Sequence, residues 1–103
     1  MRELQCILKS KAVRAGGLEG SHLVFIVTSD YMKNRMLIVR MSDASNCQQL
    51  FIYLDSEEGG TVFDEEVDQV KTLFLREEEQ ARLSIVRTGI PPTVILFIGK
   101  RKK

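Results

Sequence analysis

Alternation of apolar and polar side chains along this chain predicts six β-strands, because successive side chains of a strand point to opposite faces. The predicted strands cover residues 4–11, 22–28, 36–41, 50–54, 83–87 and 93–99. Residues 15–20 are rich in glycine, which permits positive φ, and they predict a turn between the first two strands. Residues 43–46 carry the short polar side chains that favour a turn between the third and fourth strands.

After the glycine pair at residues 59–60, the spacing of apolar residues changes from the alternation of a strand to that of a helix. The next apolar positions fall on one stripe of a helix, and they are Phe63, Val67, Val70 and Phe74. Acidic residues 64–66 stand where the helix dipole favours negative charge. The charged segment 76–82 contains no glycine or proline, which allows the helix to continue through it. We therefore predict a mainly β fold with one helical segment (α+β), in which the helix, placed between the fourth strand and the final hairpin, covers one face or end of an antiparallel sheet.

Residues 88–92 predict the tight tip of the final hairpin, since two successive prolines exclude a helix there. Ile90 lies at this tip, where its side chain is expected to be exposed. Single exposed apolar residues are common and need no function. The other interpretation is an anchor that enters a pocket on another molecule, which is worth roughly 1.5–3 kcal/mol for a fully buried isoleucine. The prolines would hold such an anchor rigidly and reduce the ordering cost of binding.

Length and composition indicate one soluble globular domain over residues 1–103. The chain is 44% hydrophobic and 28% charged, and its net charge of +1 creates no field that would attract nucleic acid or membranes. No signal peptide is recognised, and no apolar run reaches the ~18 residues of a membrane span. Cys6 and Cys47 lack metal-ligand spacing and are expected as free thiols in the cytoplasm. The basic residues 100–103 directly follow a strand, which suggests that the natural chain continues beyond Lys103.

Candidate chemistry is sparse, and we predict no catalytic, cofactor-binding or metal-binding residues. His22 is the only histidine and has no nucleophile at a telling spacing, so it is interpreted as a strand-end residue. The glycine pairs at 16–17 and 59–60 lack the spacing of phosphate-binding loops and are interpreted as turns. The clustered carboxylates are interpreted as solvated turn and helix surfaces; they are Glu57, Glu58, Asp64, Glu65, Glu66, Glu77, Glu78 and Glu79.

Three short segments resemble the head domain of the spindle assembly abnormal protein six family, the proteins of the centriolar cartwheel. They are Arg40-Met41-Ser42-Asp43, Leu50-Phe51 on the next strand, and Ser56-Glu57-Glu58. Residues 83–88 with the tip that follows are similar to the last hairpin of that family, which carries a protruding apolar residue. The segment 59–83 is shorter than the family's helical insertion, and the Gly89–Pro92 tip stands where the family more often shows an asparagine and an aromatic residue. Both departures point to a shorter, spindle-assembly-like relative.

The resemblance implies a single β-sandwich head, of the type shared with the ligase-associated DNA-repair scaffolds, without enzyme activity. It implies a homodimer in which each head inserts its tip into an apolar pocket of the other, so that Gly89, Ile90 and Pro91 form the interface. Such a head, joined to a coiled coil beyond Lys103, would build a scaffold at the centriole, basal body or flagellar base. Its partners would be itself and other proteins of these cytoskeletal structures, with no cofactor, nucleic acid or membrane.

The alternative is a pleckstrin-homology-like module that binds a phosphoinositide or a peptide. A phosphate site of that kind needs basic residues gathered in one loop. The available residues fall on different predicted loops; they are Lys9, Lys11, Arg14, Lys33 and Arg35. Such modules also usually end in a helix, whereas this chain ends in a predicted strand.

Overall fold

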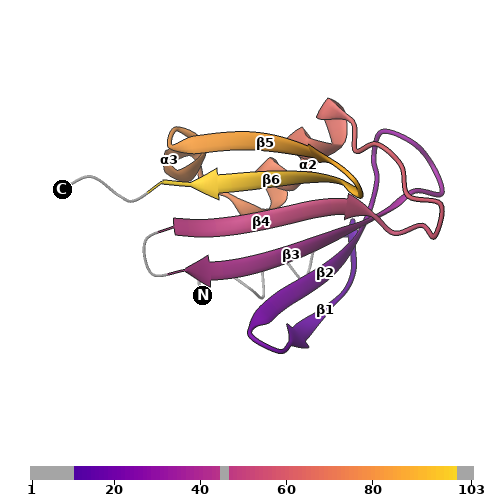
Figure 1. Cartoon of the computed structure of the whole chain (residues 1–103), viewed down its shortest axis with the longest axis horizontal. Coiled ribbons are helices and arrows are strands. Elements are labelled where there is room, and N and C mark those ends of the chain that lie inside the picture. The colour runs from indigo at the N-terminus through magenta and orange to yellow at the C-terminus, as the bar shows by residue number, and fades with distance from the viewer. Residues whose placement is uncertain (1–10, 45–46, 100–103) are drawn as a thin grey trace.

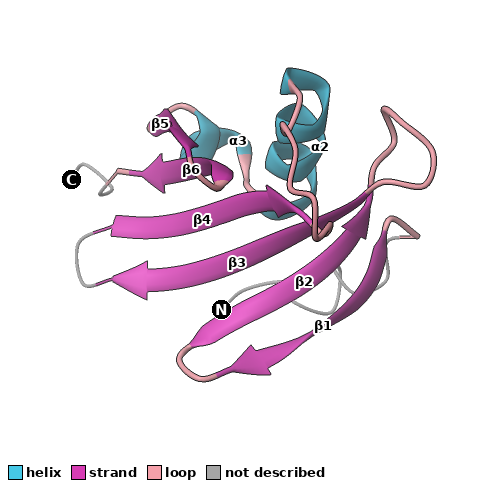
Figure 2. Cartoon of the chain, turned by 45° about the vertical axis from the view of Figure 1, so that its right-hand side comes forward, coloured by secondary structure: helices cyan, strands magenta, loops and turns pink. Residues whose placement is uncertain are grey.

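The computed structural model describes residues 11–44 and 47–99 of the chain. Its elements, in chain order, are β1 (Val13–Glu19), β2 (His22–Thr28), β3 (Met36–Ala44), β4 (Cys47–Leu54), α2 (Asp64–Phe74), α3 (Glu77–Gln80), β5 (Leu83–Gly89) and β6 (Pro92–Ile98). The strands form one antiparallel six-stranded sheet in the order β1-β2-β3-β4-β6-β5 (Figure 1). Both helices lie on the same side of this sheet (Figure 2).

The face of the sheet that α2 covers forms the hydrophobic core. The strand register aligns four side chains across β2, β3, β4 and β6, each at most 1% exposed; they are Phe25, Val39, Ile52 and Val94. From α2, Val67, Val70 and Phe74 of the predicted stripe join this core, and the ring centroids of Phe74 and Phe25 lie 5.0 Å apart. The predicted mainly β, α+β class is therefore confirmed. Within residues 11–44 and 47–99, α2 supplies the layer that covers this face.

The helix begins as predicted and ends earlier than the charge pattern suggested. Leu75 has extended dihedral angles, φ −122° and ψ 143°, and is only 6% exposed. Its side chain therefore joins the core, which turns the backbone out of the helical path although no glycine or proline is present. A separate short helix, α3, then follows from Glu77 to Gln80. The prediction of one helix continuing through 76–82 is wrong for this reason.

The first hairpin also differs from its prediction. Residues 15–20 were expected as a turn, but β1 runs to Glu19 and the turn is reduced to Gly20 and Ser21, with Gly20 at φ +64°. The predicted strand at 4–11 lies outside the described residues except for Lys11. β1 is an edge strand in which every residue after Val13 is exposed. Because β1 is held by backbone hydrogen bonds to β2 and not by burial of its side chains, its residues do not alternate between apolar and polar. Likewise, the turn predicted over 43–46 is shorter, since β3 reaches Ala44 and β4 starts at Cys47.

Candidate functional site

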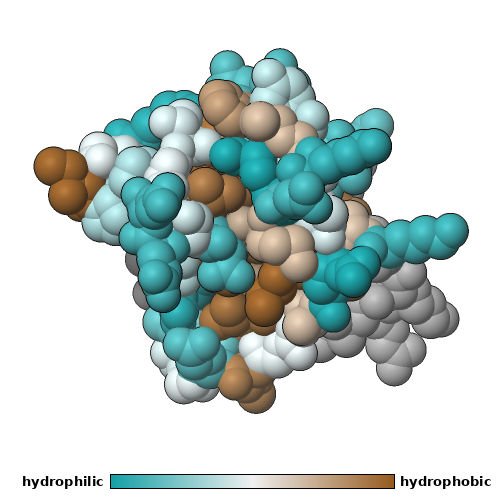
Figure 3. Space-filling view, turned by 90° about the vertical axis from the view of Figure 1, so that its right-hand side faces the viewer, coloured by the Kyte–Doolittle hydropathy of each residue, from teal (hydrophilic) through white to brown (hydrophobic). Residues whose placement is uncertain are grey.

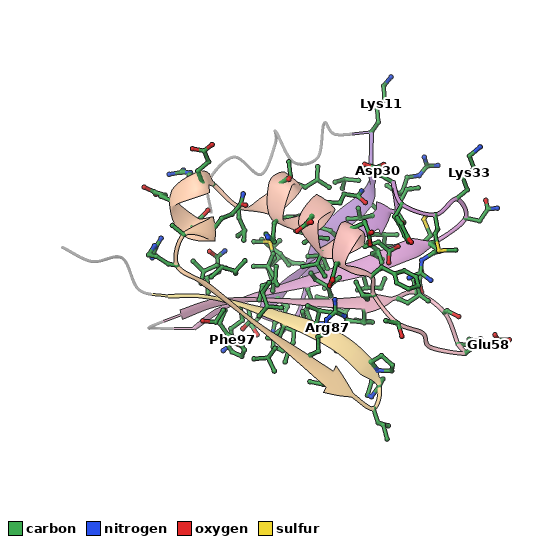
Figure 4. All side chains as sticks on the ribbon, turned by 90° about the horizontal axis from the view of Figure 1, so that it is seen from above. Lys11, Asp30, Lys33, Glu58, Arg87 and Phe97 are labelled. Atoms are coloured by element: carbon green, nitrogen blue, oxygen red, sulfur yellow. The ribbon has the colours of Figure 1, made fainter. Side chains whose placement is uncertain are left out.

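The tip of the β5–β6 hairpin presents Ile90 to solvent. Gly89 pairs with Pro92, so Ile90 and Pro91 alone form the turn, and Ile90 is 99% exposed. The turn stands away from the rest of the sheet on the side opposite the helices (Figure 4). Strongly hydrophobic surface projects on that same side in the space-filling view, at its left edge (Figure 3). The hairpin predicted from the sequence and the exposure of its apolar tip residue are thus both present.

Side-chain hydrogen bonds tie this turn together. The Thr88 hydroxyl lies 3.1 Å from the Pro91 carbonyl oxygen and 3.2 Å from that of Thr93. The Thr93 hydroxyl donates to the Pro91 oxygen over 3.1 Å. The hydroxyls of Thr88 and Thr93 therefore both fix the carbonyl group of Pro91, the residue after Ile90. Because the tip is already ordered, its insertion into a partner would lose little conformational entropy.

A recess of about 290 Å³ lies directly beside the tip. Figure 1 shows the β5–β6 turn and the end of β4 at the same end of the sheet. The lining comes from both segments and combines aromatic and aliphatic residues with polar and acidic ones; it consists of Tyr53, Leu54, Asp55, Ser56, Glu57, Gly59, Gly60, Pro91 and Pro92. An isoleucine side chain has four carbons, so this volume is ample for one.

Local backbone geometry shapes the wall of the recess that follows β4. Gly60 has φ +143°, and a Cβ there would lie 2.7 Å from Leu54 Cδ2. Only glycine fits this position, because a side chain would be strained and would displace Leu54. The Asp55 N–H donates to the Met36 carbonyl oxygen over 2.8 Å, and the Gly59 N–H donates to that of Ser56 over 3.0 Å. The loop is thereby held against the end of the sheet.

A buried ion pair fixes the start of α2 next to this loop. Glu66 is fully buried, and it accepts from Arg35 Nε at 2.9 Å, from Arg35 Nη2 at 2.7 Å and from the Phe63 N–H at 3.0 Å. Arg35 Nη2 also donates to the Thr61 carbonyl oxygen at 2.7 Å, and the guanidinium lies 4.8 Å from the Phe63 ring centroid. Two-point pairing of this kind is the strongest geometry of a carboxylate with arginine. We call Arg35, Glu66 and Phe63 the clasp.

Opposing effects act on the acidity of Glu66. Burial by itself would raise the pKa of this carboxyl group. The hydrogen bonds from Arg35, from the Phe63 N–H and from the Ser29 hydroxyl, together with the charge of Arg35, outweigh burial and hold the pKa below the ordinary glutamate value of 4.5. Glu66 therefore stays ionised in the folded protein at neutral pH.

The lowered pKa predicts a specific loss of stability in acid. The stabilisation from ionised Glu66 is complete above the unfolded-state pKa and disappears as pH falls toward the lower folded-state pKa. We expect the difference in free energy of unfolding between wild type and Glu66→Gln to be constant from pH 7 to about pH 5 and to shrink below it. Urea denaturation at a series of pH values measures this difference, and the other carboxyl groups cancel because both proteins carry them. A difference that stays constant down to pH 3.5 would contradict the assignment.

The three residues predicted for the interface, Gly89, Ile90 and Pro91, come together at the tip. The recess beside it was not predicted, because its lining is scattered over two distant segments. The interpretation of Glu66 as a solvated residue is wrong, because its side chain turns inward to Arg35. A signal was available: Glu66 is the third residue after the N-cap Phe63, where a glutamate can return to the N-cap backbone. The other clustered carboxylates remain mostly at the surface.

The basic residues considered for a phosphate site do not converge on one loop. Arg35 is engaged in the clasp, Arg14 lies on the exposed edge strand β1, and Lys9 is outside the described residues. Lys11 and Lys33 both project into solvent (Figure 4). Among the described residues, no group of three or more histidine, cysteine or acidic side chains is placed to hold a metal ion. Nor does any helix within 11–44 and 47–99 have the length and apolarity needed to cross a membrane.

Comparison with known proteins provides no relative for this arrangement. No family model matches the chain, and no curated protein or solved structure gives a significant match to it.

Proposed function

We propose that this domain is a structural self-assembly module that homodimerises through the β5–β6 tip. The observation that carries the proposal is an almost fully exposed isoleucine on a hydrogen-bonded turn, directly beside a recess large enough to receive it. An anchor and a receptor that are neighbours on one surface are self-complementary. A two-fold axis between them would place each Ile90 over the recess of the other copy.

The resemblance to cartwheel heads supports a more specific version of this proposal. In that version the domain is a sandwich-type head of a scaffold at a centriole, basal body or flagellar base. One anchor per subunit gives a small and weak interface. Assembly would then depend on avidity between many linked copies, as when a second contact joins heads into rings or filaments. The basic residues that the structure describes do not converge on one loop, and we therefore prefer this proposal to a phosphoinositide-binding module.

Replacing Ile90 by glutamate tests the proposal. We expect Ile90→Glu to keep the fold, because the side chain makes no core contact. We expect it to raise the dimer dissociation constant by at least about a hundredfold, because burying a carboxylate is costly and the acidic residues Asp55 and Glu57 already line the recess. Analytical ultracentrifugation at high protein concentration measures the effect.

Leu18→Glu is the matched control, since Leu18 is 78% exposed on the distant strand β1. It should associate like wild type. Equal self-association of wild type and Ile90→Glu would remove the tip from the interface. Pelleting of monomeric protein with phosphoinositide vesicles would point instead to the lipid-binding alternative.

A further inference from the structure

The face of the sheet opposite the helices carries two neighbouring rows of mainly apolar residues. The strand register aligns one row through Val24, Arg40, Phe51, Ile95 and Val86. A second row runs through Ile26, Ile38 and Tyr53. We call these eight residues the open face. Both helices lie on the other side of the sheet (Figures 2 and 4), so the described part of the chain places no second layer here.

The open face is unusually apolar for a surface that faces water. Val86 is 46% exposed, and the other seven residues are each partly exposed. Antiparallel sheets with one solvated face normally alternate apolar with polar residues. Arg40 is the single charged member, and its Nη2 is paired at 3.0 Å with Glu19 Oε1. A paired charge can be covered at lower cost than an isolated one.

We propose that a second copy of this chain covers the open face, so that two sheets stack face to face in the dimer. This inference rests on the proposed function, because tip exchange is what brings the two faces together. The β5–β6 turn stands on the open-face side of the sheet (Figure 4), and Tyr53 belongs both to the open face and to the recess. If the tip of a partner enters the recess, the contact can therefore extend from Tyr53 onto the rest of the open face.

The size of the whole sheet face agrees with a second copy of the chain as its occupant. Six strands at about 4.8 Å spacing, with roughly six residues of about 3.3 Å each, give about 570 Å² for the whole sheet face. The open face forms the apolar centre of this area, next to a row that includes the polar residues Ser42, Gln49 and Ser84. Two such faces would bury about 1,100 Å², which just exceeds the roughly 1,000 Å² expected of a specific interface. Aligned sheets of this kind pack about 10 Å apart with interdigitated side chains. The tips alone would bury much less.

Two neighbouring residues of β5 provide a matched pair of variants. Val86 is 46% exposed on the open face, opposite Ile95, whereas Ile85 is 47% exposed on the helix side, opposite Leu96. Their equal exposure on one edge strand makes the cost of a lysine to folding similar. We expect Val86→Lys to raise the dimer dissociation constant by about tenfold or more and Ile85→Lys to change it less than about twofold. Sedimentation equilibrium measures both, and equal constants for the two variants would overturn the proposal.

A fluorescent variant tests the centre of the face without adding charge. The chain contains no tryptophan, so Phe51→Trp introduces a single probe. We expect its emission to shift to shorter wavelength, with loss of acrylamide quenching, as the protein concentration rises through the dimerisation range. Leu18→Trp should show neither change, because the register aligns Leu18 with Leu23 and Met41 on the helix side of the sheet.

The two proposals fail in different ways. In one outcome, Ile90→Glu abolishes dimerisation, and Phe51→Trp still dimerises but is quenched by acrylamide as strongly in the dimer as in the monomer. The tips then exchange but the sheets do not stack, and this inference is overturned. If Ile90→Glu dimerises normally and Phe51→Trp becomes protected, the open face associates without the tip, and the proposed tip exchange is overturned instead.

Discussion

Replacing Glu66 by alanine should lower the free energy of unfolding by about 3 kcal/mol, because removing one partner of a buried ion pair leaves the other without compensation. Arg35 retains 17% exposure of its side chain, so its charge can reach some water and the effect should stay at the lower end of the range for buried pairs. The Phe63 N–H at the start of α2 would lose its acceptor as well. Thermal unfolding should shift by roughly 12 °C or more for a domain of this size.

Glu65→Ala is the control for this experiment. Glu65 lies in the same first turn of α2 but is exposed, so its replacement should change stability by less than about 0.5 kcal/mol. Similar melting temperatures for Glu66→Ala and Glu65→Ala would show that the clasp contributes nothing. Because Arg35 also holds the Thr61 carbonyl next to Gly60, the Glu66 variant should loosen the recess and weaken self-association in addition.

Truncation of Phe74 should have an effect at least as large. Phe74 is 2% exposed, and its ring packs against Phe25 at the junction of α2 and the sheet. We expect Phe74→Ala to lower the free energy of unfolding by about 3–5 kcal/mol, through lost burial and the cavity that remains. Urea denaturation at pH 7 with unchanged m-value would measure this difference.

The conservative variant separates cavity formation from general disturbance. Phe74→Leu keeps most of the volume and should lower stability by less than about 1.5 kcal/mol. Equal losses for the alanine and leucine variants would mean that ring geometry rather than packing volume is decisive. A loss below 1 kcal/mol for Phe74→Ala would contradict the view that α2 completes the core.

The regular spacing of apolar residues along the chain was sufficient to predict the buried strand β2 and the main helix α2. The strand at 22–28 and the buried positions Val67, Val70 and Phe74 of the helix were correctly predicted, because the spacing of buried side chains follows the backbone geometry of the element. Phe63 is instead the half-buried N-cap of α2. The final hairpin and its exposed Ile90 were also predictable, since paired prolines restrict the local backbone whatever surrounds them. β1 was missed because an edge strand with exposed side chains is held by backbone hydrogen bonds, which leave no mark on composition.

The sequence by itself determined the mainly β class, the single main helix and the apolar hairpin tip, because each depends on the order of residues within a short segment. Only the tertiary structure decided that Glu66 is buried against Arg35, 31 residues earlier in the chain. It also decided that the loop after β4 forms a recess beside the tip, and that both helices of the described residues lie on one face of the sheet. These features arise where distant segments meet, and the pairing of distant segments is set by the packing of the whole domain.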